Sequence, residues 1–500
     1  MITMNLLHKT KYILLASVLW LASSCESDFL DVNQDPNRAT SAEPPLLFTG
    51  ALNQYSTNRV IDFGPTGATA SQLWSGGGNL GAGVFTRPER YIISIFSNGN
   101  TWRTHYREVQ KNLTLAIQGA ESSDPVNNNA AAQCKIFRAL TFLSSSLIWE
   151  DVPFTEAVDI DFETLELRSP DPAFDPQEQV LNGVIGLLDE ALAQIDPESP
   201  LAITNNDLIF GGDMDNWRKF AKSLKLRTLM IMVDADPSKA GDIAALIQEG
   251  DMISSAADNA EFPFFSESGN RNPFWETLNA FAGAQNFFYF ASEAMVNVMK
   301  KYNDPRLGMY FQPYPGGDVD PNGEVVGAPP GGNIPADEAW VLSTAPVGQD
   351  GTFELVRPNS PDVLFSYQEQ LYLEAEAIAR GLAPGGVAEA DARFRAATQA
   401  AMAYRGLSAE ATDAFLATIP PLTDANAVEV ISEMTWIDQI VRPLEGWTTW
   451  RRTEMPALEL PEGAQTTGLF QRFQFAPDEA AANDNSPVDK PLDEKMWFNR

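Results

Sequence analysis

At 500 residues the chain is long enough for one large domain or for two to three ordinary ones. Hydrophobic residues make up 44% of it and charged residues 20%, a balance that argues against a disordered chain and against a coiled coil. Because 67 acidic residues outweigh 34 basic ones, the formal net charge of −33 repels phosphate groups, which argues against nucleic acid as a partner.

The first 24 residues predict a lipoprotein signal peptide. Lys9 and Lys11 give a positive start, and the apolar run over 12–22 is too short to span a bilayer. The segment before Cys25 resembles a bacterial lipobox, although Leu21 lies one place further from the cysteine than is usual. We therefore expect Cys25 to be the acylated N-terminus of the mature chain, since two or more acyl chains give lasting attachment. The alternative is an ordinary cleaved signal peptide with an incidental cysteine.

Two acidic residues, Glu26 and Asp28, come just after the cysteine. Acidic residues at this place resemble the surface-export signals of lipoproteins in the Bacteroidetes group. No later apolar stretch in the sequence is long enough to span a membrane. The sequence therefore predicts a protein of the outer membrane that is anchored by lipid alone and exposed at the cell surface.

Residues 25–500 are predicted to form one mainly α-helical domain. Ser360 is expected to cap one of its helices, with Pro361 in the first turn, and Gly381 is a natural end for the same helix. Five segments are predicted to be helical from the spacing of their apolar residues or from their end signals: 130–149, 180–195, 216–233, 361–380 and 388–404. Residues 102–117 form a further helix-like stretch.

Two long regions between these helices have no apolar periodicity. Residues 64–87 are rich in Gly, Ser and Thr, and residues 303–360 are dense in Pro and Gly. Structureless stretches of this length inside a folded protein are usually functional loops or disordered segments. We therefore expect a helical protein with large loops and a few short strands.

Few residues are available for metal or nucleophilic chemistry. With Cys25 explained, Cys134 is the only other cysteine, which excludes a disulfide scaffold and a Cys/His-rich metal site. His105 is the only histidine left after signal cleavage, and without a G-x-S-x-G motif we interpret it as structural. The glycine pattern from Gly76 lacks the strand of a dinucleotide site, and the acidic turn from Asp318 lacks the closing Glu of a calcium loop. We predict no metal and no cofactor.

The order of local motifs resembles that of the SusD/RagB family. Residues 29–37 (FLDVNQDPN) are similar to the family's opening, and residues 102–106 (WRTHY) are similar to its early W-x-x-x-Y helix. Residues 150–157 (EDVPFTEA) resemble its GDVPY-x-EA turn, with Glu150 in place of the usual glycine, and residues 222–227 (KSLKLR) resemble its NSLKLR helix. Further fragments follow in family order: 304–307, 374–377, 450–453 and 491–498.

This resemblance implies an α-helical fold of tetratricopeptide-like helix pairs with a second, irregular lobe that carries the ligand surface. It also implies a partner, a SusC-like TonB-dependent barrel in the outer membrane, which the lipoprotein would cap as a hinged lid. Members of the family bind oligosaccharides, or in some cases peptides, and catalyse no reaction. We therefore expect a binding protein that is not an enzyme.

Capture of a neutral glycan needs exposed aromatic faces for sugar C–H groups and amide or carboxylate side chains for hydroxyls. Trp74 is the first candidate, because it stands beside a run of three glycines that also leads to Asn79. Trp275, Tyr289 and Tyr314 follow, in aperiodic surroundings. The alternative for Trp74 is a loop residue folded back onto its own lobe. We expect the remaining tryptophans to be core residues: Trp102, Trp149, Trp217, Trp436, Trp447, Trp450 and Trp497.

Three other readings stay open. A peptide-binding lid would be favoured by a deep apolar cleft on the side that faces the barrel. A surface glycoside hydrolase predicts two carboxylates about 5–10 Å apart at the base of one cleft. A purely structural subunit would need no ligand of its own.

Overall fold

The long helices pack in a series, most of them against the next helix in the chain. The computed structural model describes these residues: 43–81, 83–93, 95–162, 164, 166–279, 288–346 and 354–500. The predicted signal peptide, Cys25 and the motif at 29–37 lie outside them. Residues Pro44–Arg500 form one compact unit.

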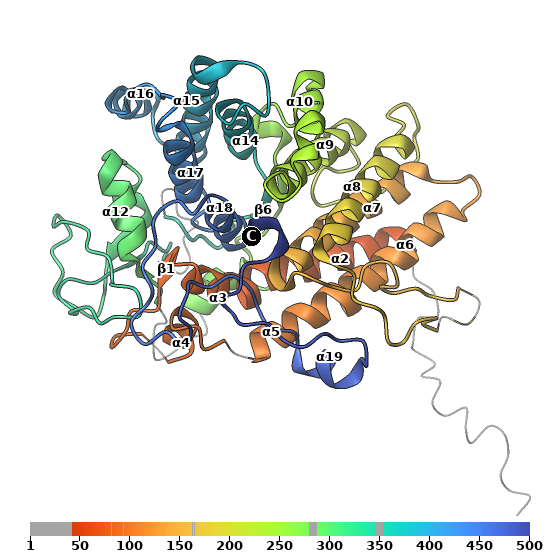
Figure 1. Cartoon of the computed structure of the whole chain (residues 1–500), viewed down its shortest axis with the longest axis horizontal. Coiled ribbons are helices and arrows are strands. Elements are labelled where there is room, and N and C mark those ends of the chain that lie inside the picture. The colour runs from red at the N-terminus through yellow and green to blue at the C-terminus, as the bar shows by residue number, and fades with distance from the viewer. Residues whose placement is uncertain are drawn as a thin grey trace, which may run out of the picture. The chain divides into compact units, whose positions relative to one another are not determined.

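The series begins with α2 on α6 and continues through α7, α8, α9 and α10 (Figure 1). In the C-terminal half α14 packs on α15 and α17 on α18, and α14 also contacts α9. The chain is thus mainly α-helical, as predicted. The bounds are α2 (Pro44–Asn58), α6 (Lys111–Glu121), α7 (Asn128–Trp149), α8 (Gln177–Gln194), α9 (Met214–Met232), α10 (Ala240–Glu249), α14 (Tyr367–Ala379), α15 (Gly386–Tyr404), α16 (Ala409–Thr418), α17 (Ala427–Asp438) and α18 (Pro443–Thr453).

Local sequence sets where several of these helices begin. The side chain of Asp213 accepts hydrogen bonds from the backbone N–H groups of the first turn of α9. Asn127 caps α7 and Ser366 caps α14 in the same way. Such caps satisfy donors that have no partner inside the helix, and each contributes about 1 kcal/mol.

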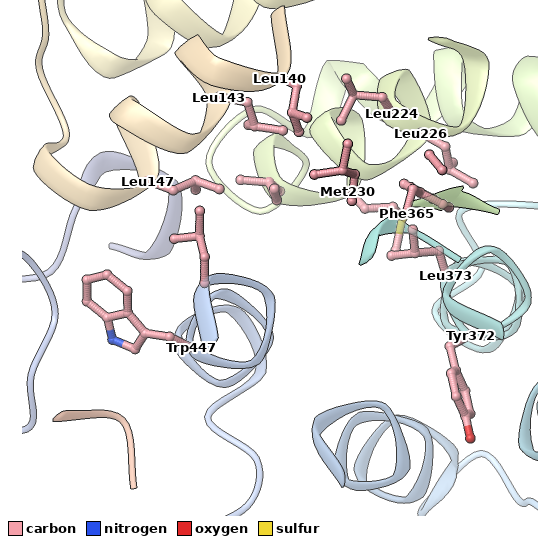
Figure 2. Packing of buried hydrophobic residues seen from close by; sticks show 14 of the residues in the cluster. Leu140, Leu143, Leu147, Leu224, Leu226, Met230, Phe365, Tyr372, Leu373 and Trp447 are labelled. Atoms are coloured by element: carbon pink, nitrogen blue, oxygen red, sulfur yellow. The ribbon is translucent and has the colours of Figure 1, made fainter. Parts of the chain in front are cut away.

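The apolar faces of the helices meet in one core. Figure 2 shows part of this core, with side chains from α7, α9, β6, α14 and α18: Leu140, Leu143, Leu147, Leu224, Leu226, Met230, Phe365, Tyr372, Leu373 and Trp447. All but one of the tryptophans predicted for the core are buried, and Trp497 is half-buried against it. Within the described residues, none of the helices is long and apolar enough to cross a bilayer.

Two π-helical segments join helices in the N-terminal part. The segment η3 (Arg59–Phe63) links α2 to α3 (Gly64–Ala70), and η4 (Thr104–Gln110) links α5 (Ile95–Arg103) to α6. A π-helical turn adds a residue to the turn and so re-aims the side chains that follow. The first segment carries the buried Arg59, and the second carries the buried His105 and Gln110.

A four-stranded antiparallel sheet organises the loop-rich part, with Trp74 opposite Ala291 and Phe290 opposite Val341. Its strands, in spatial order, are β1 (Trp74–Ser75), β3 (Phe290–Ala291), β5 (Trp340–Leu342) and β4 (Phe311–Pro313). A separate pair joins β2 (Ala260–Phe262) to β6 (Asp362–Phe365). Short helical elements complete the part of the chain that is described: α4 (Gly83–Glu89), η5 (Pro237–Lys239), η6 (Ala256–Asp258), α11 (Pro273–Asn279), α12 (Glu293–Tyr302), α13 (Leu307–Tyr310), α19 (Pro477–Ala482) and η7 (Trp497–Asn499).

The expectation of an irregular region over 64–87 was wrong in two places, because α3 and α4 are helices. All seven residues of α3 are buried, and a Cβ at Gly67 would lie 2.9 Å from the Phe63 ring. The helix therefore needs small residues all round, and a run of Gly, Ala and Thr shows no apolar stripe. The region over 303–360 is largely irregular, apart from α13, β4 and β5.

The predicted start of the helix over 361–380 was also wrong. Residues Asp362–Phe365 form β6, and the helix begins at Tyr367 with Ser366 as its cap. The strand is buried throughout, and a short apolar run of this kind fits a buried strand as well as a buried helix. Pairing with β2, a partner about a hundred residues away, decides between them.

Candidate functional site

Two identical tripeptides, Gly-Gly-Asn, lie side by side next to the sheet, at 77–79 and 331–333. Gly77 has φ +75°, and a Cβ there would lie 2.2 Å from the Phe290 ring. Gly78 has φ +50°, and its Cβ would lie 2.0 Å from the carbonyl oxygen of Gly332. Only glycine allows both the positive φ and this close approach. The first loop therefore lies flat on β3 and against the second loop.

This packing places two amide side chains at the surface. Asn79 and Asn333 are both exposed at the ends of their tripeptides. The Oδ1 of Asn79 accepts a hydrogen bond of 3.2 Å from the backbone N–H of Ile334, which ties the two loops together. The Asn79 amide nitrogen remains available at the surface, and an amide group can both donate and accept hydrogen bonds.

Aromatic rings flank the two amides. Phe288 and Tyr314 are half-buried, and their ring centroids are 5.3 Å apart at an interplanar angle of 89°. Tyr314 also contacts Phe290, with centroids 5.4 Å apart. These rings and Leu80 pack on one small hydrophobic cluster: Phe290, Ala328, Ile334, Ala339 and Val341. We call the five residues at the outside of this cluster the Asn79–Tyr314 surface: Asn79, Leu80, Phe288, Tyr314 and Asn333.

The end of α4 braces both loops from below. Glu89 is 1% exposed, and its carboxylate accepts a hydrogen bond of 3.0 Å from the backbone N–H of Gly76. The guanidinium of Arg90 donates two hydrogen bonds, of 3.1 and 2.7 Å, to the carbonyl oxygen of Gly331. Burial raises the pKa of Glu89 to about 7, although hydrogen bonds to Ser75 and to backbone N–H groups oppose the rise.

The other predicted aromatic contacts lie inside the protein. Trp74 is 2% exposed and stacks on Phe274 at 5.0 Å, while its Nε1 donates to the carbonyl oxygen of Ile440. Tyr289 contacts both of these rings. Trp275 is also buried, and its Nε1 donates to the carbonyl oxygen of Ala345. The expectation that Trp74 would be displayed on its loop was wrong, because the ring is buried and bonds to Ile440, between α17 and α18.

The structure thus brings Asn79 and Tyr314 to one surface and places Trp74, Trp275 and Tyr289 in the interior behind it. Phe288 and Asn333 were missed by the sequence analysis. The repeated Gly-Gly-Asn tripeptide was the signal that could have pointed to Asn333. The sequence carried no comparable signal for Phe288, because its exposure depends on the packing of Tyr314.

The single histidine of the predicted mature chain is buried in the helical series. The Nδ1 of His105 lies 2.8 Å from the hydroxyl oxygen of Ser145, and that hydroxyl donates to the carbonyl oxygen of Thr141. With its proton given to Thr141, the hydroxyl accepts from His105, which is the reverse of what a serine nucleophile needs. Burial lowers the pKa of His105 to about 3, so the ring is neutral at ordinary pH.

The architecture defines a helical-repeat protein of the tetratricopeptide type that carries a second, loop-rich region. Residues 36–475 match the family SusD-like_2, described as "Starch-binding associating with outer membrane". The chain belongs to this SusD-like family, which confirms the resemblance read from the motifs. No curated protein sequence matched the chain.

Solved structures share the fold over nearly the whole chain. A chitin-binding protein is 22% identical and covers 91% of this chain and 100% of its own, with a TM-score of 0.75. A SusD homologue from Parabacteroides distasonis is 18% identical (92% and 98% covered, TM-score 0.75). A chitin-binding SusD homologue from Flavobacterium johnsoniae is 19% identical (91% and 98% covered, TM-score 0.70). At these identities the likeness establishes the fold.

Proposed function

We propose that the protein captures a neutral oligosaccharide at the Asn79–Tyr314 surface and passes it to a SusC-like TonB-dependent barrel without covalent chemistry. The family's description as starch-binding supports a carbohydrate ligand, as do two chitin-binding proteins of the same fold. The net charge of −33 favours a neutral glycan over a polyanionic one, because like charges repel.

The observation that carries this proposal is the pairing of the two Gly-Gly-Asn loops beside a half-exposed aromatic pair. Sugar hydroxyls need groups that donate and accept, which Asn79 and Asn333 supply, and sugar C–H faces pack on rings such as Tyr314. Hydrogen bonds from Arg90 and to Glu89 hold the loops before any ligand arrives. A site held in this way loses less conformational entropy on binding than a free loop would.

The five predicted ligand residues take two roles in this proposal. Asn79 and Tyr314 contact the glycan directly. Trp74, Trp275 and Tyr289 support the surface from the interior, where Trp74 and Tyr289 stack around Phe274.

Affinity measurements on single variants test the site. We expect Tyr314→Ala and Asn333→Ala to weaken binding of chito- or malto-oligosaccharides about threefold to tenfold by calorimetry, with Tm nearly unchanged. Phe265→Ala and Asn322→Ala are matched controls, because these residues are exposed elsewhere, and neither should alter affinity. If the controls and the site variants bind equally well, the Asn79–Tyr314 surface is not the glycan site.

The anchor and the partner are proposals of their own. The mature chain would carry acyl groups on Cys25 and sit at the cell surface as the lid of a TonB-dependent barrel. Mass spectrometry of the native N-terminal peptide should find a lipid-modified Cys25, and Cys25→Ser should release the protein from the membrane fraction. Co-purification of a barrel with the wild-type protein from detergent extracts would test the partnership, and recovery of the lipoprotein alone would count against it.

The alternative function, a glycoside hydrolase, requires two carboxylates in one cleft. Asp362 and Asp438 do line one cavity, but its volume of about 60 Å³ holds only about four water molecules, whereas a hexose has about twelve heavy atoms. Asp362 is moreover bound to Arg59 at 2.7 Å. We therefore expect no reducing sugar on incubation with chito- or malto-oligosaccharides. Sugar release that Asp438→Asn abolishes would favour the hydrolase instead.

A further inference from the structure

A cavity of about 60 Å³ lies where several elements end, and none of the Asn79–Tyr314 surface residues lines it. Arg59 reaches it from η3, Asp362 from β6, Arg405 from the end of α15, and Asp438 from the end of α17. Arg442, just before α18, completes this wall, and Arg357 lines it from the loop that leads to β6. Four arginines and two aspartates therefore face a space with room for about four water molecules.

Only part of this charge is matched by direct contacts. Arg59 pairs with Asp362 at 2.7 Å, and Arg442 is bound to the carboxylate of Glu369. In contrast, Arg357 and Arg405 make no ion pair within 4.0 Å with any carboxylate in the described ranges, and Asp438 makes none with any described cation. Asp438 and Arg405 interact at longer range, so the two guanidinium groups without an ion pair face a single carboxylate without one.

Three hydrogen-bond donors of the arginines that line the cavity lack an acceptor. They are the Nε of Arg357, the Nε of Arg405 and the Nη1 of Arg442, each buried and without a partner among the residues that the structure covers. Leaving a buried charged donor unpaired costs about 1–3 kcal/mol or more, so three from different arginines around one cavity call for a shared acceptor.

The guanidinium of Arg405 is held in place before any acceptor arrives. Its Cζ lies 5.5 Å from the ring centroid of Tyr310 and 5.5 Å from that of Tyr404, so it is fixed by cation–π contacts. Arg442 is fixed by a hydrogen bond of 3.0 Å from its Nε to the carbonyl oxygen of Val363. A rigid pair of donors around a small space is suited to a ligand of defined size.

We propose that this cavity binds one small monovalent anion, a halide or a carboxylate of up to about four heavy atoms, held by Arg357, Arg405 and Arg442. The volume excludes a sugar ring, and the excess of unmatched arginines favours a negative occupant over a cation or water alone. Asp362 and Asp438 each keep one carboxylate oxygen without a described partner, and water beside the anion would satisfy them. Burial raises the pKa of both carboxyls, and the neighbouring arginines oppose the rise.

Bromide soaking tests the site directly. Crystals of the mature protein soaked in sodium bromide should give an anomalous peak inside the cavity, within hydrogen-bonding distance of the Arg405 and Arg442 side chains. Ordered water there without bromide, together with no bound formate or acetate in matched soaks, would overturn the proposal. Electron density for bound formate or acetate, without an anomalous bromide peak, would assign the site to carboxylates.

Thermal unfolding gives a second readout in solution. At constant ionic strength, replacing gluconate, which is too large for the cavity, by chloride, formate or acetate should raise Tm along a saturating curve, by about 2 °C. Arg405→Gln should abolish this rise. Arg393→Gln is the matched control, because Arg393 lies on the same helix at 44% side-chain exposure, and it should keep the rise. A rise of equal size in both variants would overturn the proposal. If Arg405→Gln does not fold, the bromide soak of the wild type decides alone.

Discussion

Among the long helices, three buried arginines (Arg59, Arg227 and Arg442) pair with three buried carboxylates. These pairs join η3, α9, β6, α14 and α18. Arg227 of α9 binds Glu369 of α14 at 2.6 Å, and Arg59 binds both Asp362 and Glu445, at 2.7 and 2.5 Å. Around the four-stranded sheet the main ties are instead hydrogen bonds to backbone groups, such as those of Glu89 and Arg90. The first region is held by side-chain charge and apolar packing, and the second by backbone conformation. Substitutions in the first region should therefore lower the free energy of unfolding, and substitutions in the second should change the loop conformation.

The largest effect should come from the shared acceptor of the buried charges. Glu369 accepts from both Arg227 and Arg442, so Glu369→Gln leaves these two buried cations with only their longer contacts to Glu445, at 3.8 and 4.0 Å. We expect the free energy of unfolding to fall by about 3–5 kcal/mol in urea titrations. Asp189→Asn on α8 is the surface control, since it pairs with Lys225 at 51% exposure and should cost about 1 kcal/mol or less. Equal losses in the two variants would contradict this account.

Glu150 combines the two kinds of tie in one residue. It has φ +76°, which favours glycine, yet its carboxylate binds Arg472 at 2.6 Å and Arg500 at 3.0 Å, together with Lys490 and the backbone N–H of Trp497. These contacts hold the C-terminal segment against the end of α7.

Two substitutions separate these contributions at Glu150. We expect Glu150→Ala to lower the free energy of unfolding by about 3 kcal/mol, because it loses the ion pairs and keeps the unfavourable φ. Glu150→Gly should cost about 1 kcal/mol less, since glycine adopts this φ without strain. Chemical denaturation of both variants measures the difference. If alanine and glycine destabilise equally, backbone strain plays no part at this position.

The loop-rich region should respond most to its glycines. Gly77→Ala forces a side chain into the Phe290 ring at φ +75°, so we expect a cost of about 1–3 kcal/mol and weaker oligosaccharide binding. Gly241 in α10 is the matched control, because no atom lies within 4 Å of its would-be Cβ, and Gly241→Ala should stabilise by about 0.5–1 kcal/mol. Calorimetry and denaturation on both variants measure this contrast. Unchanged glycan affinity in Gly77→Ala would show that the conformation of this loop does not affect glycan binding.

The sequence predicted the helical series better than the loop-rich region. The α9 helix was expected over 216–233 and spans Met214–Met232, because its cap and its apolar stripe are local signals. The exposure of Trp74 was not predictable in this way, since its ring is buried by Phe274, two hundred residues further on. For Gly77 and Gly78, the sequence indicated a loop, and only the structure shows that the loop lies on Phe290.

Two buried titratable groups, one in each region, should give the smallest effects, and these have opposite signs. The pKa of His105 falls from 6.5 to about 3 on folding, so its contribution to stability is full above pH 6.5 and is lost as the pH falls toward 3. The pKa of Glu89 rises from 4.5 to about 7, so its contribution is full below pH 4.5 and is lost as the pH rises through 7.

Between pH 6.5 and 5 the two groups should nearly cancel, because each changes the free energy of unfolding by about 1.5 kcal/mol in opposite directions. His105→Gln should therefore become more stable relative to wild type as the pH falls across this window, and Glu89→Gln should become less stable. Because all other titrating groups are common to the three proteins, differences between their urea titrations isolate the two sites. Parallel pH profiles for wild type and Glu89→Gln would mean that Glu89 keeps its ordinary pKa. The Glu89 carboxylate, which accepts from Gly76 beside the Gly-Gly-Asn loops, would then stay charged throughout this range.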